Sequence, residues 1–173
     1  MFTGPFFLVG AVRSGTTLLR LMLNHHPSIV FPSEFEFVVP LVTDDGKWPR
    51  LDDYYDFLEI HRAFPEFGVT VDKQLAYPEL CRSFLEQKVA QSGKQFFGST
   101  VHNDYHRLRF IWPEARYIHL IRDPRDVANS CVQMGWGGNV FAAMDIWTHA
   151  ERTWDAMERT LPEEARISIR YED

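Results

Sequence analysis

Short apolar runs alternate along this chain with longer stretches in which apolar residues recur every three or four positions. The apolar runs have the length and composition of strands, and five of them stand out: residues 6–9, 28–31, 95–100, 116–121 and 166–171. Helical periodicity or helix-boundary residues mark four longer stretches: residues 17–26, 73–93, 104–113 and 140–161. Strands that alternate with helices are typical of an α/β domain, so we predict a three-layer α/β/α fold around a central parallel sheet.

Proline, glycine and capping residues indicate where these elements end. Gly93 closes the helix expected over residues 73–93, which either runs intact or breaks at Pro78. The dipeptide Asp-Pro at residues 123–124 has the residue types of an N-cap and a first helical position. Residues 43–67 are acidic, aromatic and punctuated by proline and glycine, which favours short helices and loops. The last expected strand reads as a buried one.

The composition changes the picture mainly by what it excludes. The chain has 173 residues, of which 45% are hydrophobic and 24% are charged, and this suits a single domain over residues 1–173. The net charge of −6 argues against general affinity for nucleic acid or an anionic membrane, so an anionic ligand needs a local cluster of donors. Cys81 and Cys131 have no ligand-like spacing, which disfavours a zinc site or a disulfide framework and fits a reducing compartment.

The two ends of the chain carry expectations of their own. No apolar run is long enough to span a bilayer and no signal-peptide pattern precedes the first strand, so we expect a cytoplasmic protein with no membrane span. At the other end, the last strand runs into acidic residues and the sequence stops. We therefore expect the domain to be truncated at its C-terminus.

The segment between the first strand and the first helix reads GAVRSGTT, at residues 10–17. It fits the phosphate-loop spacing G-x-x-x-x-G-K-[ST], except that Thr16 stands where the lysine belongs and Arg13 lies inside the loop. A loop between a strand and a helix offers unpaired N–H groups and the positive helix end to an anion. Hydroxyl and guanidinium groups add further donors, so we predict a phosphate-binding loop after the first strand, formed by Arg13, Ser14, Gly15, Thr16 and Thr17.

A phosphotransferase or nucleoside triphosphatase needs more than this loop. Both chemistries use the lysine that is absent here and a carboxylate at the end of a strand to hold Mg²⁺. Asp123 follows an apolar strand, but Arg122 and Pro124 flank it, and it serves more simply as the cap of its own helix. A phosphotransferase or triphosphatase is therefore the weaker alternative, and a non-catalytic nucleotide-binding remnant is a second one.

A second segment, YIHLIRDPRDVANSCV at residues 117–132, carries Arg122 at the mouth of a strand and Ser130 on the following helix. Together with VRSGTTLLRLMLNHHP at residues 12–27, it resembles the sulfotransferase family that uses 3′-phosphoadenosine 5′-phosphosulfate (PAPS). The closing RYED resembles a third element of that family, whose tyrosine, here Tyr171, lies near the cofactor. The resemblance implies a kinase-like parallel sheet and a PAPS-dependent enzyme.

The resemblance also implies a role for each part of the motifs. Arg13, Thr16 and Thr17 would hold the phosphosulfate end of PAPS. Arg122 and Ser130 would hold its 3′-phosphate, the group that distinguishes PAPS from ATP. PAPS has no γ-phosphate, and by the resemblance no metal is expected, so a threonine in place of the lysine is consistent with this donor.

The implied reaction is transfer of a sulfuryl group to an acceptor hydroxyl or amine. By analogy with phosphoryl transfer, positioning and charge stabilisation dominate such a step. The acceptor stays open among small molecules, carbohydrates, lipids and peptides, and the sequence does not indicate an oligomeric state.

An acceptor hydroxyl loses its proton as it attacks sulfur, so a general base should lie near the loop. Glu34 is the first candidate, because many family members use a glutamate after the first helix and second strand; Glu36 lies two positions on. His102 is the rival, because some relatives end the corresponding strand with Lys-Thr-His and use that histidine. The triplet here is Thr100-Val101-His102, so the usual lysine, which assists at the bridging oxygen, is missing.

The sequence also predicts the surroundings of three tryptophans. Trp136 lies in the glycine-rich segment MGWGGN and is expected to be a packed loop anchor, with stacking on adenine or lining of the acceptor site as alternatives. Trp147, Trp154 and Met157 recur at helical spacing and are expected in the core.

Overall fold

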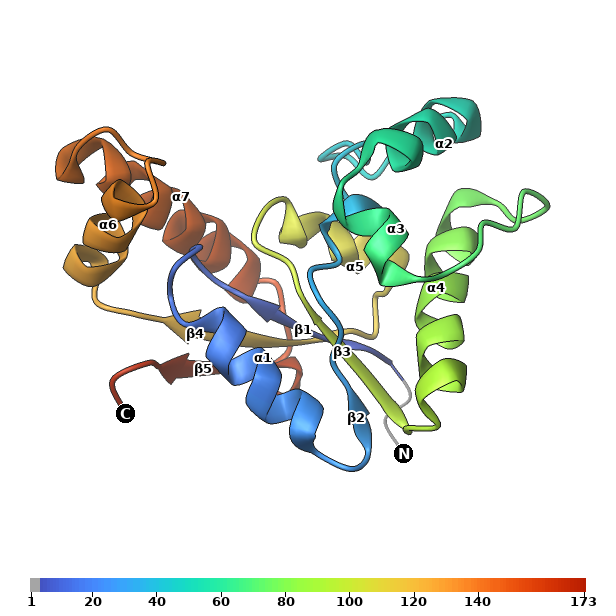
Figure 1. The fold of residues 1–173 in the computed structure, drawn as a ribbon, viewed down its shortest axis with the longest axis horizontal. Helices are drawn as coiled ribbons and strands as arrows, with labels where there is room; N and C mark the ends of the chain where they lie inside the picture. The colour runs from blue at the N-terminus through green and yellow to red at the C-terminus, as the bar shows by residue number, and fades with distance from the viewer. Residues whose placement is uncertain (1–3) are drawn as a thin grey trace.

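The computed structural model describes residues 4–173, and its strands form one parallel sheet with helices on its flanks (Figure 1). The strands are β1 (Phe6–Val9), β2 (Ile29–Val30), β3 (Phe96–Thr100), β4 (Arg116–Ile121) and β5 (Arg166–Arg170). Their order across the sheet is β2-β3-β1-β4-β5, and each pair runs parallel. The predicted α/β fold with a central parallel sheet is therefore confirmed.

The helices connect and cover these strands. They are α1 (Thr16–His25), α2 (Leu51–Ile60), α3 (Ala63–Phe67), α4 (Tyr77–Ser92), α5 (Leu108–Ile111), α6 (Pro124–Gln133) and α7 (Val140–Glu158). Short 3₁₀ helices are η1 (Glu36–Val38), η2 (Tyr105–Arg107) and η3 (Glu163–Ala165). Pro78 lies in the first turn of α4, so it starts this helix rather than breaking it, and Gly93 ends it in the left-handed conformation.

The helix predicted over residues 104–113 is shorter and less regular than its pattern suggested. Asp104 takes a φ of 52°, and the helical segment then begins as the 3₁₀ helix η2 before the single turn α5. Trp112 already leaves the helical conformation in front of Pro113. A left-handed residue at one end and a proline at the other leave room for little more than two turns.

The expectation that the last strand is buried is wrong. β5 pairs with β4 alone and forms one edge of the sheet. Most of its residues are exposed, and Ile167 is 55% exposed. Apolar and β-branched residue types indicate that a segment forms a strand. Whether that strand is buried depends on its position in the sheet, at an edge or in the centre.

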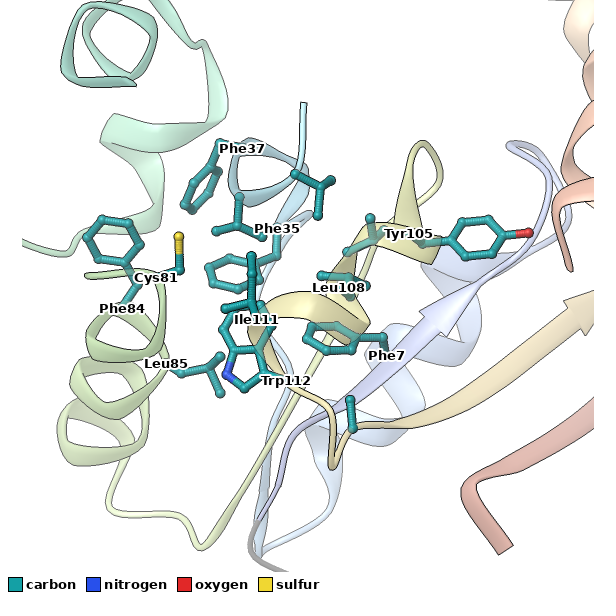
Figure 2. Close-up of a cluster of buried hydrophobic side chains, with 14 of the residues drawn as sticks. Phe7, Phe35, Phe37, Cys81, Phe84, Leu85, Tyr105, Leu108, Ile111 and Trp112 are labelled. Atoms are coloured by element: carbon teal, nitrogen blue, oxygen red, sulfur yellow. The ribbon is translucent and has the colours of Figure 1, made fainter. Parts of the chain in front are cut away.

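The main core lies under α4 and around the start of β1, and it is rich in aromatic rings (Figure 2). Phe35 is fully buried there and packs at ring-centroid distances of 5.1 Å from Phe67, 5.5 Å from Phe97 and 5.9 Å from Trp112. Aromatic pairs in such arrangements stabilise a fold beyond the burial of their area. The same packing holds in place the segment that carries Glu34.

The expected core residues of α7 are largely confirmed. Trp154 and Met157 are buried, while Trp147 is only partly buried. Its indole Nε1 donates a hydrogen bond to the backbone oxygen of Arg122 at 3.1 Å, which ties α7 to the end of β4.

The structure also gives the state of the two cysteines and the character of the helices. Cys81 and Cys131 are both free and buried, and burial raises the pKa of the Cys81 thiol to about 12. Within residues 4–173, no helix combines the length and apolar character needed to cross a membrane.

Candidate active site

The carboxyl ends of the strands meet at one edge of the sheet, and each is followed by a residue that the sequence singled out. Arg13 follows β1, Glu34 follows β2 and His102 follows β3. Arg122 and Tyr171 come directly after β4 and β5. Ligands of open parallel sheets bind in the crevice outside these carboxyl ends. The topology therefore collects residues from the whole length of the chain at the edge where a ligand is expected.

Two glycines let the loop between β1 and α1 approach its neighbours closely. Gly10 has a φ of 139°, and a Cβ there would lie 2.5 Å from the backbone oxygen of Leu120. Gly15 has a φ of 93°, and a Cβ there would lie 2.4 Å from the ring of Tyr171. Between them, Arg13 takes a φ of 69°, which is uncommon for a residue with a long side chain. The loop is a compact turn whose shape depends on glycine at both ends.

The N-terminus of α1 opens toward solvent at the end of this loop. Gly15 is its N-cap, and among the described residues no side chain caps the helix. Uncapped N–H groups and the positive end of the helix dipole make such a terminus a site for an anion. Thr17 is exposed here, whereas Ser14 is fully buried, and its hydroxyl has no hydrogen-bond partner among residues 4–173.

A cavity of about 490 Å³ opens at this edge. Its lining brings together most of the predicted site residues: Arg13, Gly15, Thr16, Thr17, Glu34, His102 and Arg122. The remaining lining residues are Val12, Leu18, Leu21 and Trp136. Of the other predicted residues, Ser130 contacts Arg13, Tyr171 contacts Arg122, and Ser14 is buried in the loop.

A cationic corner forms where the two motifs meet. Arg13 Nε donates a hydrogen bond to Ser130 Oγ at 2.9 Å, although 117 positions separate the two residues. Arg122 Nη1 donates to the backbone oxygen of Arg13 at 3.2 Å, and its guanidinium lies 4.6 Å from the ring centroid of Tyr171. The ion pair of Arg122 with Asp126 is long, at 3.7 Å, and Arg122 Nε is buried without a hydrogen-bond partner among the described residues. This corner has donor capacity to spare for an anion.

Glu34 and Glu36 have different surroundings although only one residue separates them. Glu36 Oε1 accepts a hydrogen bond from the backbone N–H of His102 at 2.7 Å, and both of its oxygens accept from the side-chain amide of Asn103. Glu34 is exposed and lines the cavity. Glu36 therefore holds the loop after β3, and Glu34 is the carboxylate that faces the cavity.

The imidazole of His102 also lies against the phosphate loop. Its Nδ1 is 3.0 Å from the backbone oxygen of Gly10, and its Nε2 is 3.4 Å from Thr16 Oγ1. Because a carbonyl oxygen only accepts hydrogen bonds, Nδ1 carries a proton. The other nitrogen is left to Thr16 and to whatever enters the cavity.

The expectation that Trp136 is a packed loop anchor is wrong. Trp136 is 52% exposed, it lines the cavity, and the Arg13 guanidinium lies 5.9 Å from its ring centroid. Sequence reasoning also missed Leu18 and Leu21 as lining residues. A signal for them exists, because α1 carries apolar residues around more of its circumference than one buried face requires.

Asp123 does what its cap motif predicts. Its carboxylate accepts a hydrogen bond from the backbone N–H of Arg125 at 2.9 Å and pairs with the Arg125 guanidinium. These hydrogen bonds lower the pKa of Asp123 to about 2. Within residues 4–173, no group of three or more His, Cys, Asp or Glu side chains is placed to hold a metal ion.

In sequence and in fold, the chain is similar to several proteins that are named sulfotransferases. The chain is 28% identical over 142 residues to protein-tyrosine sulfotransferase A from Caenorhabditis elegans, an alignment that covers 75% of this chain and 33% of that protein. The chain spans about a third of the length of the curated relatives it matches.

Two solved structures share the fold at low sequence identity. The sulfotransferase domain of the Synechococcus PCC 7002 olefin synthase matches with a TM-score of 0.71 at 22% identity, over 98% of this chain and 66% of that one. The sulfotransferase domain of the curacin biosynthetic pathway matches with a TM-score of 0.65 at 20% identity, over 98% and 68%. In addition, the model of the sulfotransferase family matches residues 5–173. With its phosphate loop, its second arginine motif and this match over nearly its whole length, the chain belongs to the sulfotransferase family.

Proposed function

We propose that this chain transfers a sulfuryl group from PAPS to an acceptor hydroxyl or amine, and that residues 1–173 act as one sulfotransferase-like domain. One observation carries the proposal. An uncapped helix N-terminus, two arginines and two candidate proton acceptors converge on one cavity from four separate strands. A phosphate loop alone would suit many nucleotide enzymes, but the second arginine motif gives the site a second place for an anion.

The residues of the cavity fit PAPS in size and chemistry. A volume of about 490 Å³ falls in the usual range for small-molecule sites. The N-terminus of α1, with Thr16 and Thr17, suits the phosphosulfate end. The buried Nε of Arg122 has no hydrogen-bond partner among the described residues. Arg13 contacts both Arg122 and Ser130, so these two residues lie close enough together to suit the 3′-phosphate. We assign these residues to the donor, with no metal ion required.

The acceptor needs a base, and Glu34 is our first assignment. It lines the cavity, it is not engaged by the hydrogen bonds that occupy Glu36, and the buried ring of Phe35 holds its backbone in place. A carboxylate free to move its oxygens toward a hydroxyl can take that proton during attack on sulfur. Tyr171 packs against Gly15 and Arg122 and would shape the donor side of the cavity.

The acceptor class is a matter for direct assay. A peptide tyrosine is the first to test, because one relative bears the name protein-tyrosine sulfotransferase. Small molecules, carbohydrates and lipids follow. We also infer a reducing compartment such as the cytoplasm, since both cysteines are free and enclosed by the fold.

Two measurements test the proposal. The first is calorimetric titration of the chain with PAPS, with adenosine 3′,5′-bisphosphate and with ATP plus Mg²⁺; we expect the first two to bind and ATP to bind weakly. The second is transfer of labelled sulfate from PAPS to a panel of acceptors that begins with tyrosine peptides. Preference for ATP with Mg²⁺ would favour a phosphotransferase instead, and tight PAPS binding without transfer to any acceptor would identify a nucleotide-binding remnant.

A further inference from the structure

We propose that His102 is a second catalytic residue, which holds positive charge against the oxygen that leaves sulfur while Glu34 removes the proton of the acceptor. This inference rests on the proposed function. It gives separate roles to two residues that otherwise compete for one.

The ring nitrogens of His102 bind both ends of the phosphate loop. Nδ1 donates to the backbone oxygen of Gly10 at 3.0 Å, at the start of the loop. Nε2 lies 3.4 Å from Thr16 Oγ1, at the first residue of α1. The ring is therefore anchored to the donor side of the site, and Nε2 is the atom that it presents to an anion held by the loop.

His102 also comes two residues after the position of the missing lysine. Thr100, which stands in the position of the missing lysine, is buried, and its hydroxyl has no hydrogen-bond partner among the described residues. Arg13 is turned toward Ser130, and Arg122 holds the backbone of the same arginine. Both guanidinium groups are thus engaged, by Ser130 or by the backbone of Arg13, whereas the imidazole contacts the first residue of α1.

Charged groups lie on several of the segments around His102. Glu36 accepts a hydrogen bond from the backbone N–H of His102, Glu34 lines the same cavity, and Asp104, two residues later, pairs with Arg107. Of the two arginines of the cavity, Arg13 donates a hydrogen bond to Ser130 and Arg122 donates one to the backbone oxygen of Arg13. An anion in contact with Nε2 stabilises the imidazolium directly.

The acceptor oxygen forms a bond to sulfur as the bond between sulfur and the 5′-phosphate oxygen breaks. Glu34 takes the acceptor's proton, and the electron pair of the broken bond stays on the phosphate oxygen of the product, adenosine 3′,5′-bisphosphate. His102 Nε2–H donates a hydrogen bond to that oxygen and offsets the charge that develops on it. Loss of one such preorganised donor typically costs about 10²–10³ in rate.

The substitution His102→Lys separates this role from that of a base. A lysine is protonated near neutral pH, so it can supply charge but cannot accept the acceptor's proton. Under saturating PAPS we expect His102→Lys to keep the rate within about tenfold of wild type and His102→Gln to lose about 10²–10³. The matched control is His106→Lys, because His106 pairs with Asp44 and is not part of the cavity lining; its rate should stay at the wild-type level.

The dependence of turnover on pH gives a second readout. The wild-type rate should rise with pH as Glu34 loses its proton and fall at higher pH as His102 loses its own, which makes a bell-shaped profile. In His102→Lys the descending limb should move upward by several pH units, since lysine ordinarily titrates near ~10.4.

Binding of adenosine 3′,5′-bisphosphate gives a readout that does not depend on turnover. At about pH 8, well above the second phosphate pKa near ~6, the bisphosphate is fully ionised. Calorimetry in buffers of different ionisation enthalpy should then show that wild type takes up protons on binding, and that His102→Lys takes up fewer.

The outcomes distinguish the two proposals. The role of His102 is overturned, with the proposed function intact, if wild type transfers sulfate but His102→Lys is as slow as His102→Gln and the rate only rises with pH. Equal proton uptake by wild type and His102→Lys would also overturn it. A wild-type chain that neither binds the bisphosphate nor transfers sulfate overturns the proposed function itself.

Discussion

Replacing Arg122 by alanine should weaken the binding of PAPS much more than that of adenosine 5′-phosphosulfate, which lacks the 3′-phosphate. A charge-assisted hydrogen bond is typically worth about 1.5–3 kcal/mol. The Arg122 side chain is 26% exposed, so solvent screening places the expected loss in the lower part of that range, at about 1.5–2 kcal/mol. This corresponds to a loss of roughly ten- to thirtyfold in affinity for PAPS relative to adenosine 5′-phosphosulfate.

The comparison of two ligands removes effects that are common to both. Arg122 also supports the backbone of Arg13, so its loss can loosen the whole phosphate loop and weaken either ligand. Both dissociation constants should be measured by calorimetry on wild type, on Arg122→Ala and on Arg125→Ala. Arg125 serves as the matched control because it lies three positions away, is 86% exposed and pairs with Asp123. Equal losses for PAPS and adenosine 5′-phosphosulfate in Arg122→Ala would refute the assignment of this arginine to the 3′-phosphate.

The remaining predictions concern the base, the core and a helix cap. Glu34→Gln should leave PAPS affinity near wild type while single-turnover transfer falls by about 10²–10⁴, and near-normal transfer would remove Glu34 from the mechanism. Phe35→Ala should destabilise the fold by about 3–5 kcal/mol in urea unfolding, because the ring is fully buried among aromatic neighbours; a loss below about 1 kcal/mol would contradict this packing. The pKa of Asp123 is lowered from 3.8 to about 2 in the folded state, so its contribution to stability should be complete above pH 3.8 and disappear as the pH falls through about 2. Unfolding of Asp123→Asn, which keeps an N-cap side chain, compared with wild type over this window checks the sign, and identical acid dependence of the two would show that ionisation of Asp123 adds nothing to stability.

Much of the fold was readable from the sequence because its signals are local. The apolar run of β1, the glycines of the next loop and the periodicity of α1 together predicted a strand, a phosphate loop and a helix. The N-cap at Asp123 and the C-cap at Gly93 were also predicted correctly. Each of these features depends on the residue types of a few neighbouring positions, which set backbone conformation and capping.

The tertiary structure decided what these local elements meet. Ser130 reaches Arg13 across 117 positions because β4 lies next to β1, and the ring of Tyr171 closes over Gly15 because β5 lies beyond β4. The hydrophobic pattern likewise could not predict the exposure of β5 and of Trp136. An apolar residue type shows which environment a side chain prefers, but not which elements cover it. The order of strands in a sheet is determined by long-range packing, which residue periodicity does not encode. The sequence by itself thus determined the chemistry that each loop carries, and the order of the strands decided which loops share a cavity.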